Sequence, residues 1–253
     1  MILLGALAQR DPAFADLRLV AGALAELTGA TLGYLPDGGN SVAACLAGVL
    51  PHRAIGGRAA QPTGFNVADM FAARLKSYIL LGGIEPALDI AAPAAFEALK
   101  AAELVVALSP YGTAKEFAHV ILPIGTFAET SGTYVNLEGR WQSVPGAASP
   151  VGESRPAWKV LRVLGNLLNL PGFDYTSSDQ ISDDVRKQLE AAPAFAIKPS
   201  ARTLQSKLAL GAAAAGEGSA SRDVPIYSVD ATVRRSSALQ ATSEARVTQR
   251  GRS

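Results

Sequence analysis

Short apolar runs alternate with longer polar and apolar segments from Met1 to about Ile124. Each run is bounded by turn residues, as buried strands are; the runs are ILLGAL, TLGYL, SYILLGG, ELVVAL and HVILPI. The segments between them predict helices at residues 11–29, 40–50, 66–76 and 94–102. Strands that are apolar throughout and separated by helices indicate a parallel sheet covered on both faces. We therefore predict a doubly wound, mostly parallel α/β domain over residues 1–125.

Polar residues mark the expected starts of several helices. Asp11 before Pro12, and Asn40 before SVAACL, occupy N-cap positions, where a side-chain oxygen accepts an otherwise unpaired backbone N–H. Thr113 and Glu116 have the spacing of a capping box for one short helix before the last strand. The sequence thus predicts that these side chains bind the backbone of their own helices.

The stretch AETSGTYVNLEGRWQ, residues 128–142, directly follows the last apolar strand. Thr133, Val135 and Leu137 alternate with more polar positions, which is the period of a half-buried strand. Gly139 supplies the positive φ that a tight turn requires, and RWQSV returns as the partner strand. The pattern predicts a hairpin that leaves the carboxyl side of the sheet, where open α/β folds bind their ligands.

Residues 126–190 are predicted to extend the domain with this hairpin and two helices. RPAWKVLRVLGNLLNL is amphipathic and begins at Pro156, and a smaller helix runs from a capping box of Ser177 and Gln180 to about Glu190. Residues 191–222 are rich in Ala, Gly, Ser and Pro and predict a flexible linker. Residues 223–253, which we call the C-terminal strap, regain apolar residues before a basic, disordered end. We expect the strap to dock on its own domain or on a neighbouring subunit.

Composition and charge exclude several classes of function. A chain of 253 residues with 49% hydrophobic residues can bury a core, and its net charge of +1 gives no general attraction for nucleic acid or an anionic membrane. No segment reads as a signal peptide or reaches the roughly 18 uninterrupted apolar residues of a membrane span, so we expect no direct membrane insertion. Cys45 is the only cysteine, which excludes a disulfide framework and a site built from several thiolates in this chain.

The candidate catalytic motifs are weak. GNSVA imitates a nucleophile elbow around Ser41, with Asp89 and His119 following in the order of an α/β-hydrolase, but helix capping explains the same residues. The two histidines have no partner ligand at helical spacing, which favours a structural role. Gly82-Gly83 favours a tight turn between strand and helix over a phosphate cradle. We therefore predict no catalytic, cofactor-binding or metal-binding residue.

The hairpin stretch resembles a segment of the molybdopterin oxidoreductase superfamily, E-x-x-G-T-x-x-N-x-E-G-R-x-Q. Within the superfamily the chain looks most like the large iron-sulfur subunit of respiratory NADH:quinone oxidoreductase (complex I). The segments that carry this likeness are TGATLGYLPDGGNSVAACLAGVLPHR, YILLGGIEPALD, GESRPAWKVLRVLGNLL and VPIYSVDATVRRSSALQAT. The last is the sharpest, because its ending is similar to that subunit and not to catalytic molybdenum enzymes.

The resemblance implies the C-terminal part of a longer subunit, with an architectural role. It implies a place on the cytoplasmic side of a bacterial inner membrane, with other peripheral-arm subunits as partners, where the chain supports electron transfer from NADH to quinone without a redox centre of its own. The iron-sulfur clusters of that family are held by a cysteine-rich amino-terminal region. Glu138 and Arg140 would hold the hairpin, and Arg234 with Arg235 would anchor the strap.

One departure separates the chain from catalytic members of the superfamily. Those members typically have Gly-x-Asn-Pro where this sequence has Gly83-Ile84-Glu85-Pro86, and a carboxylate there would repel the phosphates of the pterin cofactor. The alternative is the C-terminal fragment of a catalytic molybdopterin enzyme, of the formate dehydrogenase or nitrate reductase type.

Overall fold

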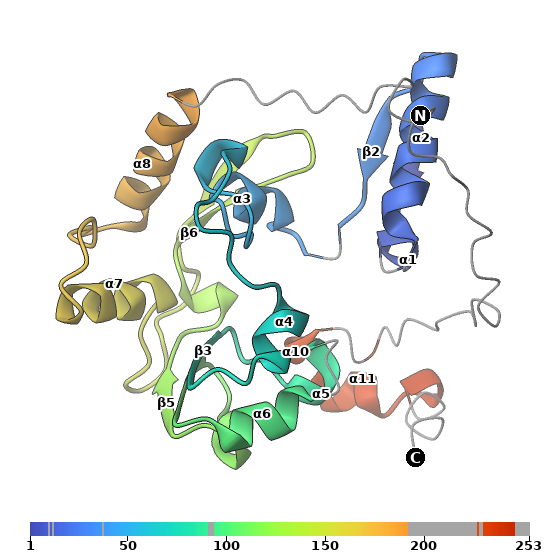
Figure 1. Cartoon of the computed structure of the whole chain (residues 1–253). Coiled ribbons are helices and arrows are strands. Elements are labelled where there is room, and N and C mark those ends of the chain that lie inside the picture. The colour runs from blue at the N-terminus through green and yellow to red at the C-terminus, as the bar shows by residue number, and fades with distance from the viewer. Residues whose placement is uncertain are drawn as a thin grey trace.

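The computed structural model describes residues 1–9, 11, 13–36, 38–90, 94–191, 227 and 230–245. In this part the chain is a mixed α/β protein, in which two parallel sheets are followed by an antiparallel hairpin and two longer helices (Figure 1). The predicted linker lies outside the described residues apart from Ala191, as does the basic end beyond Ala245.

The first unit is a small strand–helix–strand arrangement. β1 (Ile2–Leu4) pairs in parallel with β2 (Leu32–Tyr34), and α1 (Ala6–Gln9) and α2 (Phe14–Thr28) connect them. α2 buries only small residues, Ala21, Gly22 and Ala25. It ends next to Gly29, where the predicted helix also ends, and the φ of 68° at Gly29 makes a left-handed C-cap.

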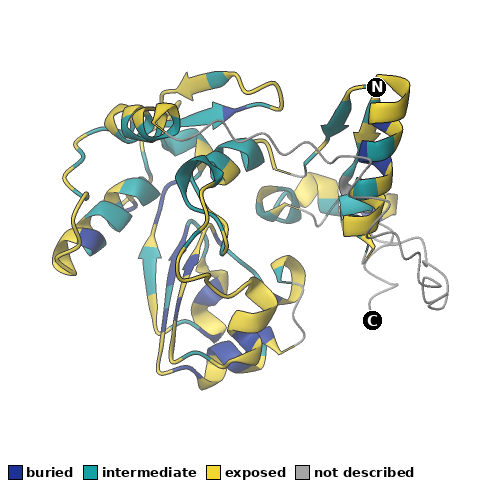
Figure 2. Ribbon diagram, turned by 45° about the horizontal axis from the view of Figure 1, so that its top comes forward, coloured by how far each residue is buried: buried dark blue, intermediate teal, exposed yellow. Residues whose placement is uncertain are grey.

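The second unit is a three-stranded parallel sheet of order β3-β4-β5. Its strands are β3 (Ser77–Leu81), β4 (Leu104–Ser109) and β5 (Val120–Pro123), and its helical segments are α4 (Val67–Ala72), α5 (Pro86–Asp89), α6 (Ala95–Ala101) and the 3-10 turn η2 (Gly112–Glu116). Figure 2 shows the buried residues gathered in this unit. Tyr78, Leu80 and Val105 pack with Phe71 and Leu99 in its core.

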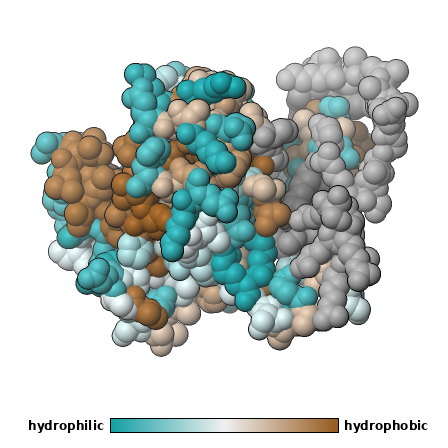
Figure 3. All heavy atoms as spheres, turned by 90° about the horizontal axis from the view of Figure 1, so that it is seen from below, coloured by the Kyte–Doolittle hydropathy of each residue, from teal (hydrophilic) through white to brown (hydrophobic). Residues whose placement is uncertain are grey.

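The other face of this sheet is only partly covered. Ile79, Leu81, Leu104 and Val120 are between 42% and 56% exposed, whereas Leu108, which pairs with Leu81 on the same face, is fully buried. Figure 3 shows hydrophobic side chains gathered on one side of the molecule, over the region of α7 and this sheet. Within the described residues, the strands form two parallel sheets and not the single sheet predicted, and the second face of the larger sheet is covered only in part. An apolar run predicts that both faces need cover, but it does not say which polypeptide provides it.

The predicted hairpin is confirmed. β6 (Gly132–Val135) pairs antiparallel with β7 (Trp141–Val144), and Gly139 has a φ of 79° in the turn between them. The 3-10 turn η3 (Phe127–Glu129) leads into the hairpin, and α3 (Ser41–Leu46) and η1 (Ile55–Gly57) lie in the segment between the two parallel sheets.

Two helices and a strap complete the described chain. α7 (Ala157–Leu167) starts after Pro156, and α8 (Ser178–Glu190) starts at Ser177, whose hydroxyl accepts the Gln180 N–H as predicted. In the strap, α10 (Ala231–Arg234) and α11 (Ser237–Gln240) lie close to α5 (Figure 1). No helix within the described ranges is long and apolar enough to cross a membrane.

Three predicted caps differ in the structure. Asp11 lies two residues before Ala13, the N-cap of α2, and accepts its N–H at 2.8 Å, whereas Asn40 and Thr113 bind other partners. Asn40 precedes α3, but its amide reaches the outer edge of β6: Nδ2 donates to the Thr133 carbonyl at 3.0 Å and Oδ1 accepts from the Val135 N–H at 2.9 Å. Thr113 makes no capping bond in η2 and instead accepts from Arg235 at 3.3 Å. Both side chains bind partners that are distant in the sequence, so local spacing could not identify them.

Candidate functional site

The carboxyl edge of the three-stranded sheet is built by the turns that follow β3 and β4. Gly82 and Gly83 have φ values of 101° and 74°, so they turn the chain from β3 toward α5 where a side chain would be strained. A Cβ on Gly83 would also lie 3.0 Å from the Tyr111 ring. The glycines thus bring the β3 turn against the β4 turn, at the edge where open α/β folds bind ligands.

Two carboxylates stand at this edge, and we call Glu85 and Asp89 the acidic clamp. Glu85 precedes α5 and Asp89 is its last residue, so the two acids are four positions apart. Asp89 Oδ2 accepts the backbone N–H of Glu85 at 2.8 Å. This bond fixes the Asp89 carboxylate at the start of its own short helix, where the unpaired N–H groups favour negative charge.

Arg234 of the strap binds the acidic clamp with both of its terminal nitrogens. Nη1 donates to Asp89 Oδ1 at 3.0 Å and Nη2 to Oδ2 at 2.9 Å, while Nε lies 3.5 Å from Glu85 Oε1. The Arg234 side chain is only 8% exposed and the two acids about a quarter exposed. A planar, two-point contact of this kind is among the stronger charge-assisted arrangements in proteins.

Arg235 adds a second guanidinium beside the first. It donates to Glu85 Oε1 and to Thr113 Oγ1, and its Cζ lies 3.8 Å from the centre of the Tyr111 ring. The Tyr111 hydroxyl in turn lies 3.3 Å from that of Thr232. Two positive and two negative charges therefore meet at the carboxyl edge of the sheet, and the strap closes it.

Hydrogen bonds within the strap hold its two short helices together. Asp230 Oδ1 accepts the N–H groups of Thr232 and Val233 at 2.7 and 3.1 Å, which caps α10. Burial alone would raise the pKa of Asp230, but those hydrogen bonds and the charge of Arg234 outweigh it and lower the pKa from its usual value. Gln240 Nε2 donates to the carbonyls of Tyr227 and Val233. The short helices α10 and α11 are thus tied together before they meet the sheet.

Ser41, Asp89 and His119, the residues of the hydrolase-like pattern, do not form a catalytic triad. Ser41 Oγ donates to the Gly38 carbonyl, Asp89 is bound by Arg234, and His119 Nδ1 accepts the Val105 N–H at 3.0 Å. Across the described ranges no three His, Cys, Asp or Glu side chains cluster as metal ligands would. At the hairpin turn, Asn136 Oδ1 accepts the N–H groups of Glu138 and Arg140, so Asn136 is the residue seen to hold the turn.

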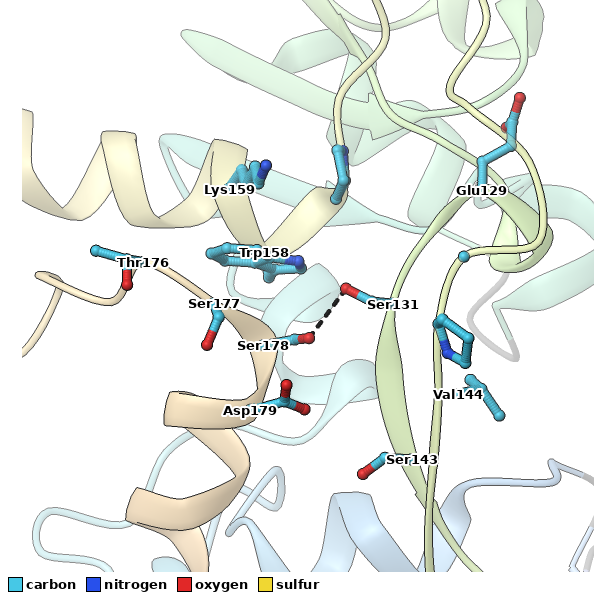
Figure 4. A pocket seen from close by; sticks show the side chains of 13 residues that line it. Glu129, Ser131, Ser143, Val144, Trp158, Lys159, Thr176, Ser177, Ser178 and Asp179 are labelled. Carbon is cyan, nitrogen blue, oxygen red and sulfur yellow. Dashed lines mark hydrogen bonds between the residues drawn. The ribbon is translucent and has the colours of Figure 1, made fainter.

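A hollow of about 560 Å³ lies between the hairpin and the starts of α7 and α8 (Figure 4). Ser178 donates to Ser131 across it at 2.9 Å, and Trp158 and Lys159 line its other side. Hydrogen bonds from Thr126 lower the pKa of Glu129, another lining residue. Lys159 is opposed by acidic residues here, so the hollow offers no clear preference for an anion or a cation.

Parallel strands with helices between them, followed by a hairpin after the last strand, define an α/β domain whose ligand edge is closed by its own chain. The molybdopterin oxidoreductase family model matches residues 1–167, and the chain belongs to that family. Its resemblance to the superfamily is thereby confirmed, and the protein is related to oxidoreductases.

Curated relatives come from different enzymes. The 78 kDa subunit of mitochondrial NADH-ubiquinone oxidoreductase from Candida albicans is 51% identical over 53 residues, which are 21% of this chain and 7% of that protein. A putative formate dehydrogenase from Staphylococcus aureus is 38% identical over 73 residues, 28% of this chain and 7% of that protein. The alpha subunit of NADPH-Fe(3+) oxidoreductase from Geobacter sulfurreducens is 37% identical over 73 residues, 28% of this chain and 9% of that protein. The matched part is less than a tenth of each relative's length.

The residues at the carboxyl edge do not fit a molybdopterin cofactor. Its phosphates are anionic, whereas the acidic clamp places two carboxylates at this edge. The two guanidinium groups that could offset those charges are already bound to the same carboxylates. An anionic group could bind a guanidinium group here only after the ion pairs of Arg234 and Arg235 with the acidic clamp had been broken.

Proposed function

We propose that this chain is the scaffold portion of the large iron-sulfur subunit of the proton-translocating NADH:quinone oxidoreductase. It supports electron transfer from NADH to quinone without carrying a redox centre. Its partners are other subunits of the peripheral arm, on the cytoplasmic side of a bacterial inner membrane.

The observation that carries this proposal is the closure of the carboxyl edge by the strap. Arg234 and Arg235 belong to the ending, VPIYSVDATVRRSSALQAT, that resembles the large iron-sulfur subunit of complex I. The same two arginines make the ion pairs with the acidic clamp. The feature that separates the chain from catalytic molybdenum enzymes is therefore the one that occupies the edge where such an enzyme would bind its cofactor.

Uncovered apolar faces support a role inside a larger assembly. The partly covered face of the three-stranded sheet exposes Ile79 and Leu81, and α2 exposes Leu17, Leu24 and Leu27 along one side. Contiguous apolar surface of this kind marks contact with other polypeptide, and parallel sheets are normally covered on both faces. A scaffold chain would meet its partners through these faces.

The alternative is the C-terminal part of a catalytic molybdopterin-dependent enzyme of the formate dehydrogenase or nitrate reductase type. The likeness to a putative formate dehydrogenase favours it. The ion pairs of the acidic clamp argue against it, because they remove the positive charge that an anionic cofactor needs.

The two proposals differ in what co-purifies with the native protein. The full chain would be tagged in the organism that carries it and purified in mild detergent. We expect NADH:ferricyanide reductase activity in the eluate and no molybdenum above background by elemental analysis. Replacing Arg234 and Arg235 together with alanine should lower the recovered activity, because the strap would no longer be anchored, whereas Lys76→Ala, at a side chain that is 84% exposed, should not.

Two results would contradict the scaffold proposal. Molybdenum at about one atom per chain would favour the catalytic alternative. Full recovery of NADH:ferricyanide reductase activity with the double alanine variant would show that the strap does not support assembly.

A further inference from the structure

We propose that the acidic clamp is a binding site for a pair of adjacent arginines, and that the C-terminal strap is an exchangeable occupant of it. The ligand class is a short peptide that presents two guanidinium groups on one helical turn. The inference concerns this edge alone and holds whichever oxidoreductase the chain serves.

The acidic clamp is organised before the strap arrives. The Glu85 N–H holds Asp89 Oδ2 at 2.8 Å, and both residues belong to the turn and helix that follow β3. Because this bond lies within one segment of chain, it does not depend on Arg234 or Arg235. Two carboxylates four residues apart repel one another, so the preformed clamp favours a cationic ligand.

The contacts select guanidinium over ammonium groups. Arg234 spans both oxygens of Asp89 with two nitrogens, at 3.0 and 2.9 Å, and a single Lys nitrogen cannot reproduce that fork. Arg235 places its planar group over the Tyr111 ring and donates to Glu85 and Thr113 from the same position. Lysine carries the same charge but lacks the planar group that stacks on the Tyr111 ring.

The occupant is separable from the core. Among the described residues, the main hydrophobic cluster runs from Phe71 to Ile121 and contains no strap residue. The strap holds its own shape through the Asp230 cap and Gln240. Ala245 of the strap is buried, but the contacts that hold the strap on the acidic clamp are charged and polar. Such contacts can break and re-form without unfolding the sheet, and salt weakens them.

Exchange can be measured with the full chain carrying Arg234→Ala and Arg235→Ala, so that its own strap no longer competes. A fluorescent peptide of residues 227–245 is titrated against it, and binding is read by anisotropy. We expect saturable binding at low salt. A peptide with both arginines changed to lysine should bind at least about tenfold more weakly, because charge-assisted hydrogen bonds are lost. Adding Asp89→Asn to the acceptor should abolish binding of the arginine peptide.

Equal affinity for the two peptides would overturn the selection of arginine. Failure of the arginine peptide to bind an acceptor with a native circular dichroism spectrum would overturn exchange.

A second measurement uses the unchanged chain in case that acceptor does not fold. Trypsin cleavage after Arg234 should accelerate when NaCl is raised from about 50 mM to about 500 mM, because added salt screens the carboxylates of the acidic clamp, which are about a quarter exposed. A cleavage rate that does not change with NaCl concentration would contradict an exchangeable strap.

The outcomes separate this inference from the proposed function. Peptide binding reads the acidic clamp directly, whereas co-purification reads the assembly. Either can fail while the other holds.

Discussion

At the scale of single residues, polar side chains join segments that are far apart in the sequence. Asn40 ties α3 to β6, and Arg234 ties the strap to α5. The sequence predicted a local cap for Asn40 and an anchoring role for Arg234, yet gave neither partner. N-cap spacing is a local signal, whereas these bonds join residues 93 to 145 positions apart.

Asn40 offers a test of such a bond. In Asn40→Asp the carboxylate still accepts the Val135 N–H, but it faces the Thr133 carbonyl without a donor. We expect the free energy of unfolding to fall by about 1–3 kcal/mol. Urea denaturation checks this, with Ser41→Ala as the neighbouring control, because that hydroxyl is exposed and bonds only the Gly38 carbonyl. Equal losses for both variants would mean that the amide contributes nothing specific.

At the scale of elements, most strands and helices follow from the hydrophobic pattern. β1 to β7, α2 and the starts of α7 and α8 lie where the apolar runs and turn residues predict them. Their ends depend on local chemistry, such as Gly29 after α2 and Pro156 before α7, and this chemistry is legible in the sequence. The packing of one element on another is not, and Gly165 is an example.

Gly165 lies in α7 directly against Phe173. A Cβ there would come within 2.2 Å of the Phe173 ring, so the space belongs to the aromatic side chain. Alanine normally stabilises a helix interior over glycine by about 1 kcal/mol. We expect Gly165→Ala to destabilise the chain instead, by roughly 1–3 kcal/mol, because the ring must move. Thermal unfolding checks this against Gly5→Ala, where nothing lies within 4 Å. A raised melting temperature for Gly165→Ala would contradict the packing.

At the scale of the whole molecule, the fold class was predictable and the arrangement of its sheets was not. Apolar strands alternating with helices indicate an α/β protein, and the family match over residues 1–167 agrees. The strands nevertheless form two separate parallel sheets, and one face of the larger sheet is only partly covered. The hydrophobic pattern of the strands cannot identify which polypeptide segment packs on that face.

The sequence also identified one residue of the site but not the residues that bind it. Glu85 stood out in the sequence because it replaces an amide that catalytic members typically have. Its two arginine partners could not be assigned to it, because they follow a long segment that the sequence leaves without a packed position. Closure of the carboxyl edge by the strap therefore emerges only when the chain is folded.

The measurement that tests this closure most directly is a double-mutant cycle between Arg234 and Asp89 in the full chain. The free energy of unfolding is measured for the parent, for Arg234→Ala, for Asp89→Ala and for the pair. We predict a coupling energy of about 1–3 kcal/mol, because the pair is two-pronged and Arg234 is 8% exposed. The matched control is Lys76 with Glu103, 3.2 Å apart with side chains 84% and 69% exposed, for which at most about 1 kcal/mol is expected. Coupling between Arg234 and Asp89 no larger than in that exposed pair would contradict a strap that closes the sheet.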